Sequence, residues 1–128
     1  MPIYYTIDVA RGVVRVAMSG VVDPTDTLRF LEQLAADPSL RPAMPQLLDF
    51  TRVGTPPTVA ESESVAQGFA RLRHRFEGAR CAVVVADPLA FGAIRQFAAL
   101  AARAAVEVRP FLDQREAERW LALPEAHQ

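Results

Sequence analysis

Alternation of apolar and polar residues near the N-terminus predicts a pair of antiparallel strands. Apolar side chains recur at every second position over 3–9 and again over 14–18, which is the period of a strand with one buried face. The intervening segment 10–12 (Ala-Arg-Gly) fits a tight turn, since Gly12 can adopt a positive φ. These two strands are therefore expected to form a hairpin.

Helical spacing of apolar residues predicts four helices, each beginning at a capping residue. Asp23-Pro24 and Asp87-Pro88 each combine an acceptor side chain with a proline suited to the first helical position. Thr58 and Glu61 have the spacing of a capping box, and residues 113–116 (Asp-Gln-Arg-Glu) resemble another. We expect these helices over about 24–36, 58–76, 88–105 and 113–123.

Three further apolar segments, at 44–50, 81–86 and 106–112, are expected to be strands. The second is apolar throughout and rich in valine, which is typical of a central strand covered on both faces. The element order is then β-β-α-β-α-β-α-β-α, in which helices between strands imply parallel neighbours and right-handed crossovers. We expect one α/β domain over 1–128, with its core at about 3–123 and a five-stranded mixed sheet with four helices.

Composition narrows the classes of function. A chain of 128 residues that is 51% apolar can bury a sizeable core, and a net charge of −1 argues against non-specific nucleic-acid binding. The single cysteine excludes an internal disulfide and a cysteine-cluster metal site. Apolar runs are too short for a membrane span, and the N-terminus does not resemble a signal peptide, so we expect a cytoplasmic location.

From residue 3 to residue 123 the chain resembles the STAS superfamily, named for sulphate transporters and anti-sigma-factor antagonists, and in particular its compact bacterial SpoIIAA-like branch. The resemblance rests on the element order and on four segments: GVVRVAMSG, LLDFTRV, CAVVVAD and VRPFLDQREAERWL. It implies a stack of βα units with a mixed sheet. It also implies a role in binding or regulation rather than in catalysis, because some members bind apolar ligands or lipids and others bind a kinase-type regulator.

Anti-sigma antagonists carry an Asp-Ser-Ser-Gly-like motif after the third strand, with a phosphorylated serine at a helix N-terminus. The matching segment here, 54–58, reads Gly-Thr-Pro-Pro-Thr and has neither an Asp-Ser pair nor a following glycine. Thr55 precedes a proline, and Thr58 is expected to cap a helix, a bond that phosphorylation would remove. The departure puts a phospho-switch in doubt, although it stays an alternative function.

Ligands of open α/β sheets tend to bind beyond the carboxyl ends of the strands. We therefore predict a binding site at this rim for a protein partner, or for an apolar small molecule or lipid, without a cofactor. The alternative is that the rim residues only cap helices and stiffen a loop. The candidate residues are Arg52, Val53, Thr55, Pro57, Thr58, Asp87 and Phe91.

Arg71 and Arg75 are four residues apart in a predicted helix and would share one face. Such a basic ridge is suited to an acidic partner or to lipid headgroups in a peripheral membrane contact. The simpler interpretation is a solvated helix face.

Catalysis requires titratable groups that converge in one cleft. His74 and His127 match neither a metal motif nor a catalytic triad, and Cys81, at the start of the apolar strand, is expected to be a buried core thiol. We therefore expect no enzymatic activity. An unrecognised hydrolase or transferase that uses Asp49, Asp87 or His74 remains an alternative.

A structural homodimer is a further alternative. It would require exposed apolar residues, such as Tyr4, Phe30 or Phe111, to form one contiguous patch.

Overall fold

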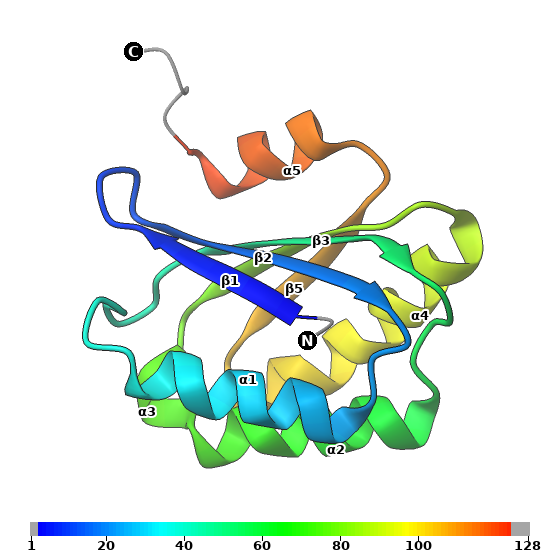
Figure 1. The fold of residues 1–128 in the computed structure, drawn as a ribbon, viewed down its shortest axis with the longest axis horizontal. Coiled ribbons are helices and arrows are strands. Elements are labelled where there is room, and N and C mark those ends of the chain that lie inside the picture. The colour runs from blue at the N-terminus through cyan, green and yellow to red at the C-terminus, as the bar shows by residue number, and fades with distance from the viewer. Residues whose placement is uncertain (1–2, 124–128) are drawn as a thin grey trace.

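A computed structural model describes residues 3–123 and shows a five-stranded sheet with the strand order β1-β2-β3-β4-β5. Figure 1 shows helices on both sides of this sheet, with the C-terminal helix alone on the face opposite the others. The strands are β1 (Ile3–Asp8), β2 (Val13–Gly20), β3 (Gln46–Val53), β4 (Arg80–Val84) and β5 (Glu107–Phe111). The helices are α1 (Pro24–Ala36), α2 (Val59–Arg71), α3 (Arg73–Phe76), α4 (Pro88–Ala101) and α5 (Gln114–Leu121), and a 3-10 helix spans Ala102–Ala104.

The sheet is mixed as the sequence predicts. β1 pairs antiparallel with β2, and all later neighbours are parallel. The fold class predicted from the sequence is confirmed, and the four-residue helix α3 is the last part of the helix expected over 58–76.

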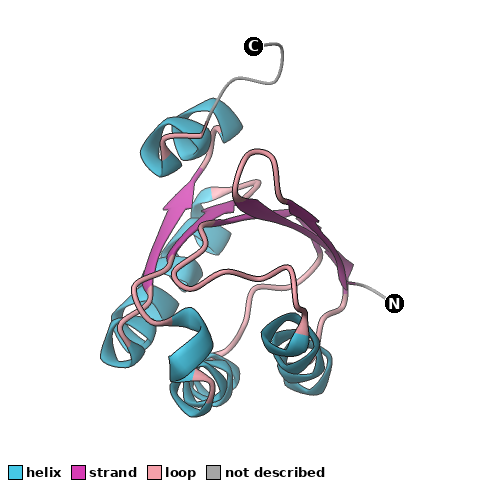
Figure 2. Cartoon of the chain, turned by 90° about the vertical axis from the view of Figure 1, so that its left-hand side faces the viewer, coloured by secondary structure: helices cyan, strands magenta, loops and turns pink. Residues whose placement is uncertain are grey.

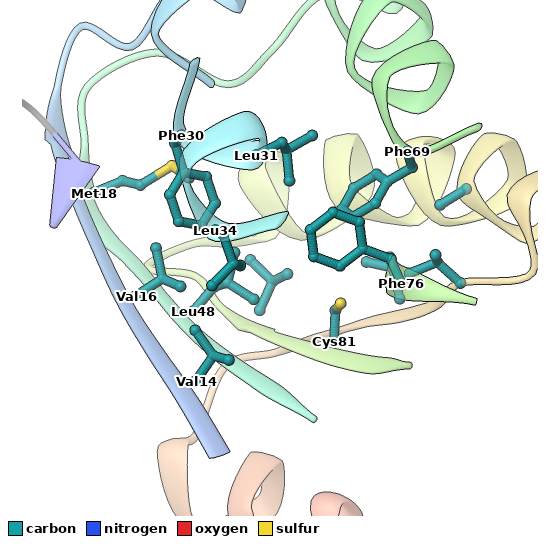
Figure 3. Close-up of a cluster of buried hydrophobic side chains, with 14 of the residues drawn as sticks. Val14, Val16, Met18, Phe30, Leu31, Leu34, Leu48, Phe69, Phe76 and Cys81 are labelled. Carbon is teal, nitrogen blue, oxygen red and sulfur yellow. The ribbon is translucent and has the colours of Figure 1, made fainter. Parts of the chain in front are cut away.

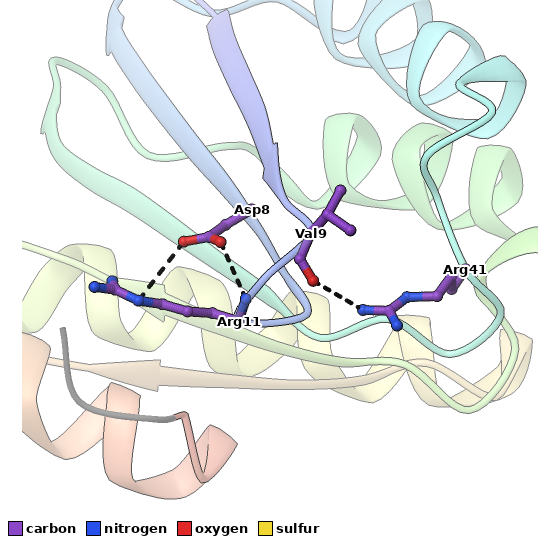
Figure 4. A network of polar contacts seen from close by, with 4 residues as sticks. All are labelled: Asp8, Val9, Arg11 and Arg41. Atoms are coloured by element: carbon purple, nitrogen blue, oxygen red, sulfur yellow. Dashed lines mark hydrogen bonds and ion pairs between the residues drawn. The ribbon is translucent and has the colours of Figure 1, made fainter. Parts of the chain in front are cut away.

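The turn of the N-terminal hairpin is held by polar contacts that Figure 4 shows. Gly12 has a φ of 68°, and its amide donates to the Asp8 carbonyl at 2.8 Å. The Asp8 carboxylate accepts from the Arg11 amide at 3.0 Å, and Arg41 donates to the Val9 carbonyl at 3.4 Å. These bonds fix the turn that sets the register of β1 against β2.

Helix starts follow the predicted caps. Asp23 and Asp87 each accept from the amide three residues ahead at 2.9 Å, with a proline in the first helical turn. At α5 the cap differs in detail, because Asp113 accepts from the amide of Arg115, two residues ahead, rather than from that of Glu116.

The main core lies between the sheet and the helices α1 to α4, and Figure 2 shows the sheet arched over the helices on this side. Figure 3 shows its side chains, in which residues of β2 and β3 meet those of α1 and α2. The opposite face of β4 and β5 packs on α5 through a second cluster. β4 is therefore covered on both faces, as its apolar sequence predicts.

Three expectations need correction. The helix expected over 58–76 divides at Leu72, where φ is −103° and ψ is 24°, so Arg71 and Arg75 lie on two different helices. The strand expected over 44–50 instead spans Gln46–Val53, because its last residues pair with the end of β2 beyond a bulge.

The third correction concerns two aromatic residues that a dimer patch would need. Phe30 is 5% exposed and Phe111 is 8% exposed, so both belong to the core, whereas Tyr4 is 66% exposed. Phe30 packs edge-on against Tyr5, and Phe111 packs against Trp120 of α5. The contiguous apolar patch built from these three residues is therefore not formed.

Candidate functional site

An apolar cavity opens at the carboxyl rim of the sheet, beneath the connection from β3 to α2. Its volume is about 100 Å³, and it extends between the sheet and the helices α1, α2 and α4. The lining residues are Met18, Val22, Thr27, Phe30, Leu31, Gln46, Leu48, Phe50, Val53, Thr55, Pro57, Ser62, Val65, Phe69, Cys81, Val83, Ile94, Phe97 and Val108. None of these is Asp, Glu, His, Lys or Arg, so the cavity carries no ionisable group apart from one thiol and is suited to an uncharged, apolar occupant.

The depth of this cavity follows from the alternation of side chains along β3. Gln46, Leu48 and Phe50 point to the same face and all line the cavity. At about 3.3 Å per residue, the four steps from Gln46 to Phe50 span about 13 Å. The cavity thus runs from the rim to the beginning of the strand.

The connection from β3 to α2 forms the mouth. Thr55 and Pro57 line the cavity from this connection, and Val53 lines it from the last position of β3. Thr58, by contrast, completes the predicted capping box. Its hydroxyl accepts from the Glu61 amide at 3.1 Å, while its own amide donates to the Glu61 carboxylate at 2.9 Å.

A second hollow of about 100 Å³ lies beside this mouth, between the β3–α2 and β4–α4 connections. It brings together Val53, Pro57 and Asp87 from the predicted set, with Leu89 exposed at its edge. The Asp87 carboxylate accepts from the Ala90 amide and caps α4.

Two of the predicted residues lie apart from these hollows. Arg52 is exposed near the end of β3. Phe91 is half-buried in α4 and packs against the main core. The structure therefore gathers Val53, Thr55 and Pro57 at one mouth and does not bring Arg52 or Phe91 to it.

The two arginines of the predicted basic ridge have different surroundings. Arg71 is exposed near the end of α2. Arg75 is half-buried, and its guanidinium donates to the carbonyls of Ala35 at 2.8 Å, Leu40 at 3.0 Å and Asp37 at 3.4 Å. Arg75 thus links α3 to the end of α1 and to the loop that follows it.

Sequence reasoning missed two buried polar residues that line the cavity. Gln46 is 1% exposed and Ser62 is 3% exposed. Ser62 lies in the first turn of α2, near the mouth, and Gln46 begins β3, at the far end. The sequence did contain an indication for Gln46. It lies at every second position with Leu48 and Phe50, so its side chain is expected to face the core with theirs.

Cys81 lies next to Gln46 across the β3–β4 pairing and lines the same end of the cavity. It is 3% exposed, which confirms the predicted core thiol. Burial raises the pKa of this thiol from 9.0 to about 12, so it is fully protonated at neutral pH and is a poor nucleophile.

The raised pKa of Cys81 gives a testable dependence of stability on pH. The folded thiol keeps its proton above pH 9, whereas the unfolded thiol loses it, so unfolding becomes more favourable as pH rises. We expect this group to lower the free energy of unfolding by about 1 kcal/mol between pH 9 and pH 10. Urea titrations of the wild type and Cys81→Ala at both pH values measure it, and an equal pH dependence in the two proteins would contradict it.

The titratable residues proposed for an unrecognised hydrolase are separated. The Asp49 carboxylate accepts from the hydroxyl of Thr51 at 2.6 Å, and Asp87 caps α4. His74 lies on α3, which precedes β4, and so is at the opposite end of the sheet from Asp87, which follows β4. Within residues 3–123 no group of three or more His, Cys, Asp or Glu side chains is placed to hold a metal ion, and His127 lies outside the described residues.

The opposite face of the sheet carries a third hollow of about 290 Å³ beside α5. Exposed Tyr4 lines it together with Thr6 and Arg15 on β1 and β2, and with Asp49 on β3. α5 packs on β4 and β5 and leaves this part of the sheet uncovered (Figure 1).

Comparison with solved structures confirms the fold expected from the resemblance. The chain is similar to an uncharacterized protein of the DUF3478 family with a SpoIIAA-like fold, from Shewanella loihica PV-4. The match has a TM-score of 0.62 and 20% sequence identity, and it covers 93% of each chain. No family model and no curated protein sequence matches the chain. The SpoIIAA-like fold is therefore established by shape, while function has to be argued from the cavity.

Proposed function

We propose that this chain is a non-enzymatic binding module for an apolar small molecule, and that its site is the cavity beneath the β3–α2 connection. The observation that carries the proposal is an apolar cavity whose mouth lies at the carboxyl ends of parallel strands. This is the place where open α/β sheets usually bind ligands. Three of the residues predicted for the rim, Val53, Thr55 and Pro57, line the mouth.

The chemistry of the lining supports binding rather than catalysis. An active site needs an acid, a base, a nucleophile or a metal near the reacting atoms. The cavity offers a thiol whose pKa is about 12, together with the neutral polar groups of Gln46, Ser62, Thr27 and Thr55. We propose that the module works in the cytoplasm and needs no cofactor. Among the helices within residues 3–123, none has the length and hydropathy of a membrane span.

The volume of the cavity limits the size of the ligand that it can hold. An apolar cavity of roughly 150 Å³ is large enough to hold benzene. The cavity here measures about 100 Å³ and is open at the rim. It therefore suits a narrow aliphatic group inside, with the remainder of a larger molecule or lipid extending past Thr55 and Pro57.

Filling the cavity tests this proposal. Val65 lines the cavity from α2, whereas Val59 on the same helix is 55% exposed. We expect Val65→Phe to weaken binding of 2-methylhexane at least about tenfold, equivalent to about 1.4 kcal/mol, because the ring occupies the space that the alkane needs. Chemical-shift titration of the isotope-labelled protein measures the affinity, with circular dichroism to confirm that each variant is folded.

Val59→Phe is the matched control and should bind as the wild type does. Failure of the folded wild type to bind the alkane at saturation would overturn the proposal, as would equal binding by both variants. Native mass spectrometry of freshly purified protein, followed by organic extraction, then identifies the natural occupant.

A second candidate function is docking of a protein partner on the uncovered part of the sheet. It is favoured by Tyr4, which is 66% exposed beside the hollow that Arg15 and Asp49 also line. A homodimer through this face is one form of it, and sedimentation at high protein concentration tests for that form. The phospho-switch remains a third candidate, and it would require Thr55 or Thr58 to accept phosphate.

A further inference from the structure

Gln46 is the polar residue that the fold buries most deeply inside the cavity. It is 1% exposed, and no atom of residues 3–123 accepts a hydrogen bond from its Nε2. Buried polar side chains almost always have a hydrogen-bond partner, and an unpaired one reduces stability. An unpaired donor at the end of an otherwise apolar cavity therefore needs an explanation.

The surroundings of Gln46 do not offer a substitute partner. Its neighbours across the sheet are Val14 on β2 and Cys81 on β4, and the next residue on the same face of β3 is Leu48. All three are buried. A bound water usually needs two to four polar partners, and these side chains supply only a weakly polar thiol besides the amide itself.

We propose that Gln46 is the anchor for the polar end of the ligand, and that Nε2 donates to an uncharged acceptor such as a ketone, ester or amide carbonyl. This inference rests on the proposed function, because it places the same ligand in the same cavity. The ligand enters acceptor first, and its apolar part runs along Leu48 and Phe50 towards the rim.

The charge of the acceptor follows from the lining. No arginine, lysine or histidine lines the cavity, so a carboxylate at Gln46 would be buried without a counter-charge. Burial of an unpaired charge is far more costly than burial of a neutral carbonyl that receives a hydrogen bond. The site should therefore discriminate against ionised fatty acids and in favour of neutral carbonyl compounds.

A pair of isosteric probes tests the anchor. Hexan-2-one and 2-methylhexane have equal numbers of non-hydrogen atoms and differ in a carbonyl oxygen against a methyl group. We expect the ratio of ketone affinity to alkane affinity to fall about tenfold from the wild type to Gln46→Leu, because the ketone loses the hydrogen bond and the alkane loses nothing. The ratio cancels differences in how the two probes leave water.

Ser62→Ala is the matched control, since it removes a buried polar group near the mouth of the same cavity, and it should leave the ratio unchanged. Gln46→Met serves as a second variant if the leucine variant does not fold. The bound ketone, labelled at its carbonyl carbon, should also show the downfield shift of a hydrogen-bonded carbonyl in the wild type and in Ser62→Ala, but not in the Gln46 variants.

The outcomes separate this inference from the proposed function. Equal ratios in the wild type and in the Gln46 variants would overturn the anchor and leave the apolar binding module intact. If neither the ketone nor the alkane binds to the wild type, both the anchor and the proposed binding function are overturned. A tighter complex with hexanoate than with hexan-2-one at neutral pH would also overturn the anchor, since it would require a charge that the lining does not balance.

Discussion

Replacement of Phe76 with alanine is expected to lower the free energy of unfolding by about 3–5 kcal/mol. The side chain is 1% exposed and packs edge-on against Phe69, with ring centroids 5.4 Å apart and an interplanar angle of 82°. Truncation removes its apolar surface from the core and leaves a cavity, and both effects destabilise the fold. Figure 3 shows Phe76 close to Cys81 of β4, within the main core.

Guanidinium titrations followed by circular dichroism measure this loss. Phe76→Leu is the conservative comparison and should lose much less, because most of the volume is kept. Phe91→Ala provides a matched deletion at a half-buried ring of α4 and should also cost less. A loss for Phe76→Ala no larger than that for Phe91→Ala would contradict the prediction.

The predictions of local structure succeeded where a short segment contains its own physical cause. Asp23-Pro24 and Asp87-Pro88 begin helices as predicted, because a carboxylate cap and a proline act within one turn. The hairpin followed from period-two alternation and from Gly12, whose positive φ the structure confirms. The resemblance then supplied the topology, and comparison with a solved structure of the same fold confirms it.

The predicted ends of helices and strands were wrong where pairing or packing between distant segments determines them. β3 extends to Val53 because Ser19 and Gly20 of β2 pair with its last residues across a bulge. The break at Leu72 could not be predicted from the apolar spacing, since Val65, Phe69 and Phe76 fit one continuous helix equally well. Each of these outcomes depends on a partner that lies far away in sequence.

The cavity opens at the rim where the sequence places the candidate residues, but its depth was not predicted. The rim and the apolar character of its residues followed from the strand ends, and Val53, Thr55 and Pro57 do line the mouth. The cavity behind them arises from the distance between the sheet and three helices, which no local pattern encodes. Gln46 was overlooked because a single polar residue at the start of an apolar strand is usually a boundary, whereas here it faces the core.

Replacement of Arg75 with methionine is expected to lower the free energy of unfolding by about 2–3 kcal/mol, because hydrogen bonds from a charged donor contribute more than neutral ones. Its guanidinium donates to three carbonyls, of Ala35, Asp37 and Leu40. The last turn of α1 carries no basic residue of its own. Arg75 therefore also supplies the positive charge that favours a helix C-terminus.

Methionine keeps the apolar stem of Arg75 and removes only the guanidinium, so the loss measures the polar contacts. Arg73→Met is the matched control on the same helix. Arg73 is half-exposed; its ion pair with Glu77 is 3.8 Å long, and its one hydrogen bond, to the Arg103 carbonyl, is 3.5 Å long and exposed, so the change should stay within about 0.5 kcal/mol of the wild type. Arg75→Lys should fall between them, because an ammonium group keeps the charge but cannot reach three carbonyls with a planar fork.

Equal losses for Arg75→Met and Arg73→Met in urea titrations would show that the guanidinium contacts do not stabilise the end of α1. The expected contrast bears on function as well. A guanidinium that already serves three backbone carbonyls has few donors left for an acidic partner. A basic surface in this region would then depend on Arg71 and Arg73, which are both exposed.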